Sequence, residues 1–72
     1  MKKTIYSKEH KHIIDKLIKA RVAAGLRQGD VANKLKRSQS YVSKTESGQR
    51  RIDLIQLKAF AEIYKKGLNY FV

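Results

Sequence analysis

The sequence predicts an all-α fold of four to five short helices, in one small domain that spans residues 1–72. Apolar side chains recur three and four residues apart, which is the period of a helix with one buried face. No segment carries the alternating pattern of a half-buried strand. Proline is absent, and Gly25, Gly48 and Gly67 each follow a periodic segment, where glycine favours the end of a helix.

The first helix is expected over residues 8–24. Residues 1–6 are predicted to form a loose arm with two lysines, and Ser7 is placed to cap the first turn, because its hydroxyl can accept a hydrogen bond from a free backbone amide. Gly25 follows the helix in the position that favours a left-handed backbone. The apolar stripe of this helix comprises Ile14, Leu17 and Ile18.

Two helices of about eight residues each are expected over 28–35 and 39–46. Ser38 is predicted to cap the second of them, and Gly48 to end it. Their inward-facing residues are predicted to be Val31, Ala32, Leu35, Val42 and Thr45. Helices this short are not stable alone, so they need longer helices to pack against.

A fourth helix is expected over residues 53–65, with Asp53 as its cap and Gly67 as its end, and residues 68–72 are expected to add one last turn. The predicted core comprises Leu17, Leu26, Val31, Ala32, Leu35, Val42, Leu54, Leu57, Phe60 and Ala61. Two short helices joined by a tight turn and held between longer ones form a helix-turn-helix arrangement.

The charge of the chain points to a polyanionic partner. Lys and Arg number 17 against 6 Asp and Glu, which gives a net charge of +11. Residues 27–51 contain seven basic and two acidic residues, so much of the excess falls on the two short helices and their flanks. Nucleic acid is the first expectation, and an anionic membrane surface the second.

Cysteine is absent, which excludes a disulfide framework and thiolate-ligated zinc and fits a reducing compartment. No apolar run reaches the length of a membrane span, and the N-terminal lysines precede no apolar signal segment. We therefore expect a cytoplasmic protein without membrane association.

A set of motifs follows in order along the chain: Arg21 before AAGL, Gln28 opening a helix with VA..L, then SQSYVSK.E.G.R and L..L..FAEIY. In this order and spacing, the chain from Ile13 to Val72 resembles the phage repressor and Cro-type helix-turn-helix regulators, also called xenobiotic-response-element-type. The resemblance implies a lambda-repressor-like domain. It also implies a sequence-specific transcriptional regulator, a repressor or controller, that binds double-stranded DNA as a homodimer on a near-palindromic operator.

The chain departs from the family pattern at three places. Arg27 stands where the family has a capping Ser or Thr, Lys36 and Arg37 stand where the turn has Gly and an aliphatic residue, and Thr45 stands where Ile or Leu is usual. The first two departures add cations beside the expected path of the DNA backbone.

Helix 39–46 is the expected recognition helix. Its candidate base readers are Gln39, Ser40, Ser43 and Lys44. They are spaced three and four residues apart and so share a face, and their amide, hydroxyl and ammonium groups can pair with base edges in the major groove. The resemblance places base contacts on Gln39, Ser40 and Lys44. The alternative is that these are ordinary solvent-facing polar residues.

Phosphate contacts are expected around the same helices. The resemblance gives Gln28 the role of gripping the DNA backbone, and Ser38 is expected to cap its helix before anything else. Tyr41 either packs in the wall of the domain or reaches a phosphate with its hydroxyl. Further candidates for phosphate contact are Lys34, Lys36, Arg37, Gln49, Arg50 and Arg51.

Arg21 and Glu46 have a structural role in this interpretation. The resemblance pairs the two positions as a partly buried ion pair, so neither is expected to read DNA. The sequence does not decide which residues form the dimer surface. The C-terminal residues Leu68, Tyr70, Phe71 and Val72 either form it or close as a lid over the first and fourth helices.

Other function classes find less support. No His follows residue 12 and there is no glycine-rich phosphate loop, so we expect no enzyme, no cofactor and no small-molecule ligand. His10 and His12 point to different helix faces and do not form a metal site. The alternative function is an antitoxin-like interaction module that also binds its own operator. Binding of RNA or membranes through charge alone is a third possibility.

Overall fold

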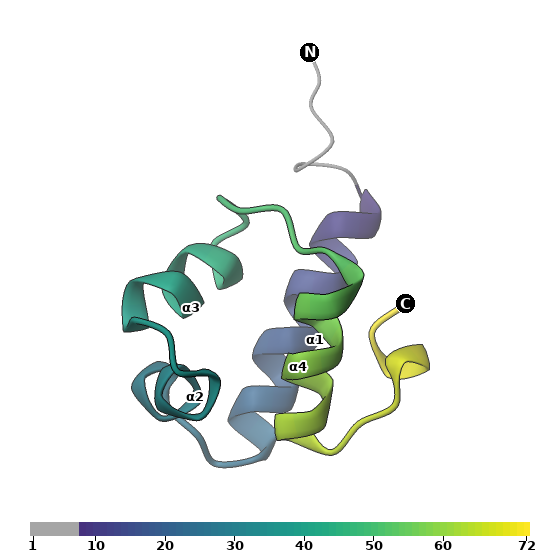
Figure 1. Ribbon diagram of the computed structural model, residues 1–72. Coiled ribbons are helices and arrows are strands. Elements are labelled where there is room, and N and C mark those ends of the chain that lie inside the picture. Colours follow the sequence, from purple (N-terminus) through teal and green to yellow (C-terminus); the bar gives the residue numbers. More distant parts are fainter. Residues whose placement is uncertain (1–7) are drawn as a thin grey trace.

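The computed structural model describes residues 8–72, and within them every regular element is helical (Figure 1). The elements are α1 (Lys8–Ala23), α2 (Gln28–Leu35), α3 (Gln39–Glu46), α4 (Leu54–Tyr64) and the 3-10 turn η2 (Leu68–Tyr70). The prediction of an all-α fold is therefore confirmed. The expectations for the arm of residues 1–6 and for Ser7 lie outside the described residues.

The two short helices α2 and α3 pack against each other, and both contact the longer helices (Figure 1). α3 packs on α1, α2 packs on α4, and η2 turns back onto α4. None of the helices in residues 8–72 is long and apolar enough to cross a membrane.

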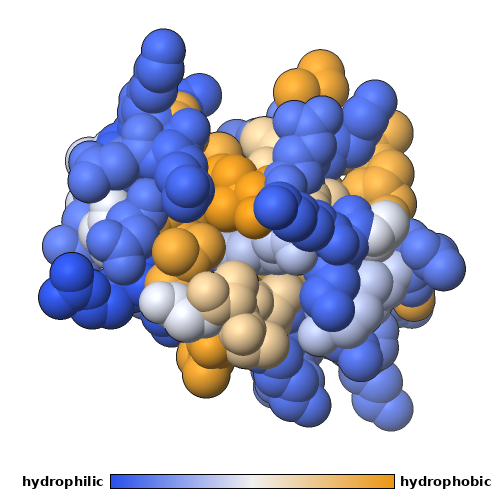
Figure 2. Space-filling model, turned by 90° about the horizontal axis from the view of Figure 1, so that it is seen from below, coloured by the Kyte–Doolittle hydropathy of each residue, from blue (hydrophilic) through white to orange (hydrophobic). Residues whose placement is uncertain are grey.

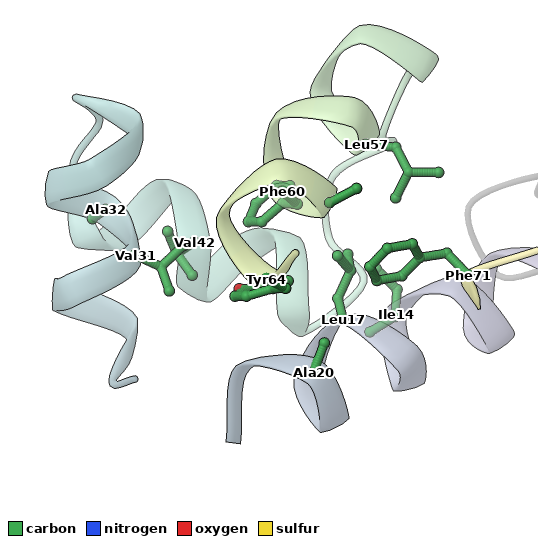
Figure 3. Close-up of a cluster of buried hydrophobic side chains, with 11 residues drawn as sticks. Ile14, Leu17, Ala20, Val31, Ala32, Val42, Leu57, Phe60, Tyr64 and Phe71 are labelled. Atoms are coloured by element: carbon green, nitrogen blue, oxygen red, sulfur yellow. The ribbon is translucent and has the colours of Figure 1, made fainter. Parts of the chain in front are cut away.

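One core joins the four α-helices and Phe71, the residue that follows η2 (Figure 3). Its residues are Ile14, Leu17, Ala20, Val31, Ala32, Val42, Leu57, Phe60, Ala61, Tyr64 and Phe71. Of these side chains α2 contributes only Val31 and Ala32, and α3 only Val42. The two short helices are therefore stable only as part of this shared core.

The predicted core is wrong at Leu54, whose residue is 62% exposed. Leu54 is the first residue of α4, directly after its cap, and lies outside the buried stripe that begins at Leu57. Leu26 and Leu35 are only partly buried and pack at the margin of the core.

Phe71 corrects the expectation for the C-terminus. Its ring is 0% exposed and lies in the core near Leu17 and Ile14, and it meets Tyr70 edge-on at 5.0 Å (Figure 3). Because its side chain is used inside the domain, Phe71 is not available as part of a dimer surface. At this residue the C-terminus closes the domain, as the lid interpretation expects.

The helix ends follow their caps. Ser38 Oγ accepts a hydrogen bond of 3.2 Å from the backbone amide of Tyr41, which confirms the predicted cap of α3. Asp53 and Gln56 exchange hydrogen bonds of 2.8 and 3.1 Å between side chain and backbone, so α4 begins with a capping box. α4 ends at Tyr64, one residue before the predicted end at residue 65, because Lys65 adopts a left-handed conformation with φ 57°.

The turn between α2 and α3 places the two helices at a fixed angle. Lys36 has φ 60° and ψ 43°, its amide donates to Asn33 O, and the amide of Arg37 donates to Ala32 O at 2.9 Å. This is the hydrogen-bond pattern of a glycine-type helix end, formed here by a lysine. The left-handed residue that the resemblance leads one to expect as glycine is thus present in geometry but not in sequence.

Candidate nucleic-acid interface

α3 has one buried and one open face. Val42, Thr45 and Glu46 are buried, whereas all four residues predicted as base readers are exposed. The exposed set is Gln39, Ser40, Ser43 and Lys44. A helix with an accessible polar face has the diameter and the donor groups that the major groove accepts.

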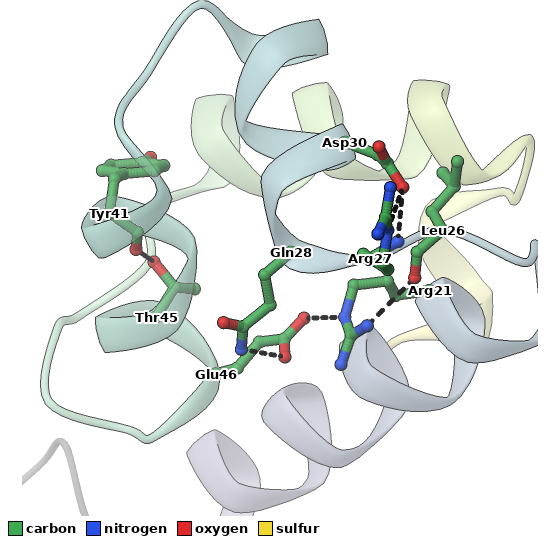
Figure 4. Close-up of polar contacts among 8 residues, drawn as sticks. All are labelled: Arg21, Leu26, Arg27, Gln28, Asp30, Tyr41, Thr45 and Glu46. Carbon is green, nitrogen blue, oxygen red and sulfur yellow. Dashed lines mark hydrogen bonds and ion pairs between the residues drawn. The ribbon is translucent and has the colours of Figure 1, made fainter.

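The inner face of α3 keeps its one buried hydroxyl satisfied. Thr45 Oγ1 donates a hydrogen bond of 2.8 Å to the carbonyl oxygen of Tyr41, one turn earlier in the same helix (Figure 4). This bond lets a threonine occupy a position that is usually aliphatic, because its polar atom remains paired after burial.

Glu46, the last residue of α3, links this helix to α1 and α2 (Figure 4). Its Oε2 accepts from Arg21 Nε at 2.7 Å, and its Oε1 accepts from Gln28 Nε2 at 3.0 Å. Arg21 also donates to the carbonyl oxygen of Leu26 at 3.0 Å. The side chains of Arg21 and Glu46 are only 16% and 5% exposed, and the hydrogen bond that Arg21 donates to Glu46 raises the pKa of Arg21.

Gln28 is therefore not a free surface side chain. It is half-buried, and one of its two amide N–H bonds is directed at Glu46. A primary amide has a second N–H and a carbonyl oxygen, so Gln28 retains groups for another partner. Sequence reasoning missed this contact, because the two residues lie 18 positions apart.

The N-terminus of α2 is capped from within the helix. Arg27 makes no side-chain cap, as its lack of an acceptor requires. Instead Asp30 accepts a hydrogen bond of 2.8 Å from the backbone amide of Arg27 and lies 3.5 Å from its guanidinium (Figure 4). The backbone hydrogen bond from Arg27 lowers the pKa of Asp30.

A concave region of about 850 Å³ lies between the N-terminal ends of α2 and α3. Arg27 and Gln28 line it on one side, and Arg37, Ser38 and Gln39 on the other. The lining also includes Asp30, which pairs with Arg27, while Arg37 and the starts of two helices add positive charge.

Tyr41 packs within the domain. Its ring stacks on the buried Phe60, with 6.4 Å between the centroids and 3° between the planes. The guanidinium carbons of Arg37 and Arg50 lie 4.9 and 4.6 Å from the centroid of the Tyr41 ring. The packing alternative for Tyr41 is confirmed, and its contact with DNA stays a prediction.

The remaining predicted phosphate contacts lie at the surface around α2 and α3. Lys34, Lys36, Arg37, Gln49 and Arg51 are exposed, and Arg50 is half-buried beside Tyr41. Their positions allow contact with a strand that passes the ends of α3, and their role in binding stays a prediction.

Tyr64 is a polar group that the sequence did not single out. It falls on the apolar stripe of α4, yet its hydroxyl is buried and has no hydrogen-bond partner in the structure. Burial raises the pKa of Tyr64, and the nearby charge of Glu46 raises it further.

Residues 16–66 match a family model described as a helix-turn-helix domain. The match begins within α1, contains α2, α3 and α4, and ends two residues after α4. No curated protein matches the chain.

Proposed function

Because the chain belongs to the helix-turn-helix domain family, we propose that it is a transcriptional regulator and not an enzyme. In this proposal it is of the phage repressor and Cro type and binds specific sequences in double-stranded DNA. The observation that carries the proposal is the open polar face of α3, which presents an amide, an ammonium and two hydroxyl groups while its other face is buried in the core.

In this proposal α3 enters the major groove and reads base edges. Gln39 can form two hydrogen bonds with adenine, and Lys44 can donate to O6 and N7 of guanine. Ser40 and Ser43 lie on the same open face and can add weaker contacts. Removal of a good base contact costs about 1–3 kcal/mol of discrimination at one position.

The DNA backbone is held on both sides of the turn. Gln28 grips a phosphate with the N–H that Glu46 leaves unused, and the hydrogen bond to Glu46 keeps the amide oriented for it. Lys36 and Arg37 add positive charge at the exposed turn. Phosphate contacts of this kind position the protein and make binding depend on salt, but they do not read sequence.

A homodimer on a near-palindromic operator is part of the proposal, because one protomer presents only four candidate base readers. Two-fold helix-turn-helix dimers place their recognition helices about 34 Å apart. Without Phe71, the C-terminal candidates for the interface are Leu68, Tyr70 and Val72.

Figure 2 shows that hydrophobic side chains reach the surface seen from below in patches among hydrophilic ones. Leu54 and Ile55, exposed by 62% and 79%, open α4 just after the loop that follows α3. We add these two residues to the candidate dimer surface. Sedimentation of the protein with and without its operator, repeated with Ile55→Asp, separates this surface from the C-terminal one.

Selection of bound duplexes from a random pool, read by sequencing, tests the proposed function. We expect one enriched consensus with two-fold symmetry and half-sites one helical turn apart. A pool that remains random after several rounds would contradict specific binding. Copurification of an enzymatic partner that masks α3 would instead favour the antitoxin-like alternative.

A further inference from the structure

A second cleft lies beside α3, away from the N-terminus of α2. It has a volume of about 310 Å³. Its lining residues are Arg37, Ser38, Ser40, Tyr41, Lys44 and Arg50. Three of them are cationic, three carry hydroxyl groups and none is acidic, so the chemistry of the lining suits an anion with several oxygen atoms.

The ring of Tyr41 brings two of these cations together. Arg37 belongs to the turn before α3 and Arg50 to the loop after it, yet both guanidinium carbons lie within 5 Å of the Tyr41 centroid. Each cation is attracted to the electron-rich ring. Phe60, which is 1% exposed, stacks on the same ring and limits its movement.

The cleft has hydrogen-bonding capacity that the protein leaves unused. The Nε of Arg50 is buried and has no hydrogen-bond partner in the structure. Ser38 Oγ accepts from the amide of Tyr41, which leaves its own O–H able to donate. Two guanidinium groups near one ring also repel each other, and a bound anion would relieve that repulsion.

We propose that this cleft, the Arg37–Tyr41–Arg50 cleft, binds one phosphate of the DNA backbone, and that Tyr41 is a positioning residue which sets both guanidinium groups for it. The inference rests on the proposed function. Arg37 and Ser38 line this cleft and also the concave region beside Gln28. The first turn of α3 is thus held between two phosphate contacts, which fixes the tilt at which Gln39 and Lys44 meet the bases.

The salt dependence of DNA affinity tests the role of Tyr41. Each phosphate that a protein neutralises contributes about −0.9 to the slope of log K against log salt concentration. Tyr41→Leu removes no charge, yet we expect it to make the slope less negative by about 0.9, as Arg37→Gln does. Between 50 and 200 mM salt, the affinity of Tyr41→Leu then falls about three- to fourfold less than that of the parent protein.

Two variants serve as controls. Tyr41→Phe keeps the aromatic face and is expected to keep the parental slope. Lys58→Gln removes one charge from the exposed face of α4, outside both clefts, and is also expected to keep the parental slope. Thermal melting of each variant shows that the slopes belong to folded protein. If Tyr41→Leu does not fold, the slopes of Arg37→Gln and Arg50→Gln, compared with that of Lys58→Gln, decide whether the cleft holds a phosphate.

The outcomes separate this inference from the proposed function. A parent protein that binds no duplex would overturn both. A parent protein that binds specifically, with slopes unchanged in Arg37→Gln, Arg50→Gln and Tyr41→Leu, would overturn the cleft alone. Inorganic phosphate, titrated without DNA at constant ionic strength, should bind only at millimolar concentration. Saturation at micromolar phosphate would show that the cleft is a site for free phosphate, which would contradict its role as a contact for the DNA backbone.

Discussion

Glu46 is the residue on which the junction of the first three helices depends. It pairs with Arg21 at 2.7 Å and accepts from Gln28 at 3.0 Å, and its side chain is 5% exposed. Glu46→Ala leaves Arg21 without its charged partner, so we expect a loss of about 3 kcal/mol and a fall in melting temperature of at least about 12 °C. Thermal unfolding followed by circular dichroism measures this change.

Glu46→Gln is the matched control, since it keeps the size and an acceptor oxygen but removes the charge. We expect a smaller loss of stability than in Glu46→Ala. In both variants the ranking of DNA sequences should stay as in the parent protein at a temperature where the variant is folded. An unchanged melting temperature in Glu46→Ala would contradict a structural role for the Arg21–Glu46 pair.

The buried hydroxyl of Tyr64 is expected to destabilise the fold. It has no hydrogen-bond partner in the structure, and a buried polar group without one costs about 1–3 kcal/mol. Tyr64→Phe should therefore raise stability by about 1 kcal/mol, or about 4–8 °C in melting temperature. Tyr70→Phe, at a half-buried ring, should change the melting temperature little. A clear loss of stability in Tyr64→Phe would show that the hydroxyl has a partner.

Sequence reasoning works well for single residues where the neighbours are local. The three- and four-residue spacing placed Val42 and Thr45 inside and Gln39 and Lys44 outside, as the structure has them. It could not predict the bond from Gln28 to Glu46, because contacts between distant positions depend on the packing of whole helices. Phe71 was ambiguous for the same reason: a terminal aromatic residue fits a lid and an interface equally well.

At the scale of helices, two lysines mark the ends of α2 and α4. Lys36 and Lys65 have φ values of 60° and 57°, in a region that costs a residue with a side chain about 1–2 kcal/mol. Lys36→Gly and Lys65→Gly should therefore each raise stability by about 1 kcal/mol in thermal unfolding. Only Lys36→Gly should also weaken DNA binding, since Lys36 lies in the exposed turn before α3, whereas Lys65 follows α4. If neither glycine raises the melting temperature, the left-handed geometry at these ends is incorrect.

The start of α2 gives the fold a dependence on pH. Asp30 accepts a hydrogen bond from the amide of Arg27, which lowers the pKa of Asp30 below its usual value. A carboxyl with a lowered pKa in the folded state stabilises above the unfolded pKa, and this contribution disappears as pH falls through the folded value. Asp30→Ala should thus melt at a lower temperature than the parent at pH 7, with a difference that shrinks towards pH 3. A difference that does not vary with pH would exclude the carboxylate as the cause.

Helix boundaries were predictable where a capping residue stands in the sequence. Ser38 and Asp53 begin α3 and α4 as their side chains suggest. The end of α4 was placed one residue too late, because Gly67 was the only stop signal in the sequence, whereas Lys65 already adopts the left-handed conformation. A lysine gives no local signal for that role, so the position became clear only from the backbone.

The whole molecule is organised around the exposure of one short helix. A single core drawn from the four α-helices and Phe71 holds α3 by its inner face, while the outer face of α3 and the adjacent clefts collect polar and cationic groups. Composition predicted a polyanionic partner from the net charge of +11, but only the three-dimensional arrangement brings Arg37 and Arg50 to the same ring.

One set of affinities tests the claim that α3 reads DNA sequence. The affinities are those for a selected duplex and all its single-base variants. They are measured for the parent protein and for Gln39→Ala, Lys44→Ala and Lys36→Ala. Gln39→Ala and Lys44→Ala should each lose about 1–3 kcal/mol of discrimination at one base-pair position in each half-site and keep it elsewhere. Lys36→Ala should weaken every duplex by a similar factor. If all three variants weaken all duplexes alike, α3 does not read the bases.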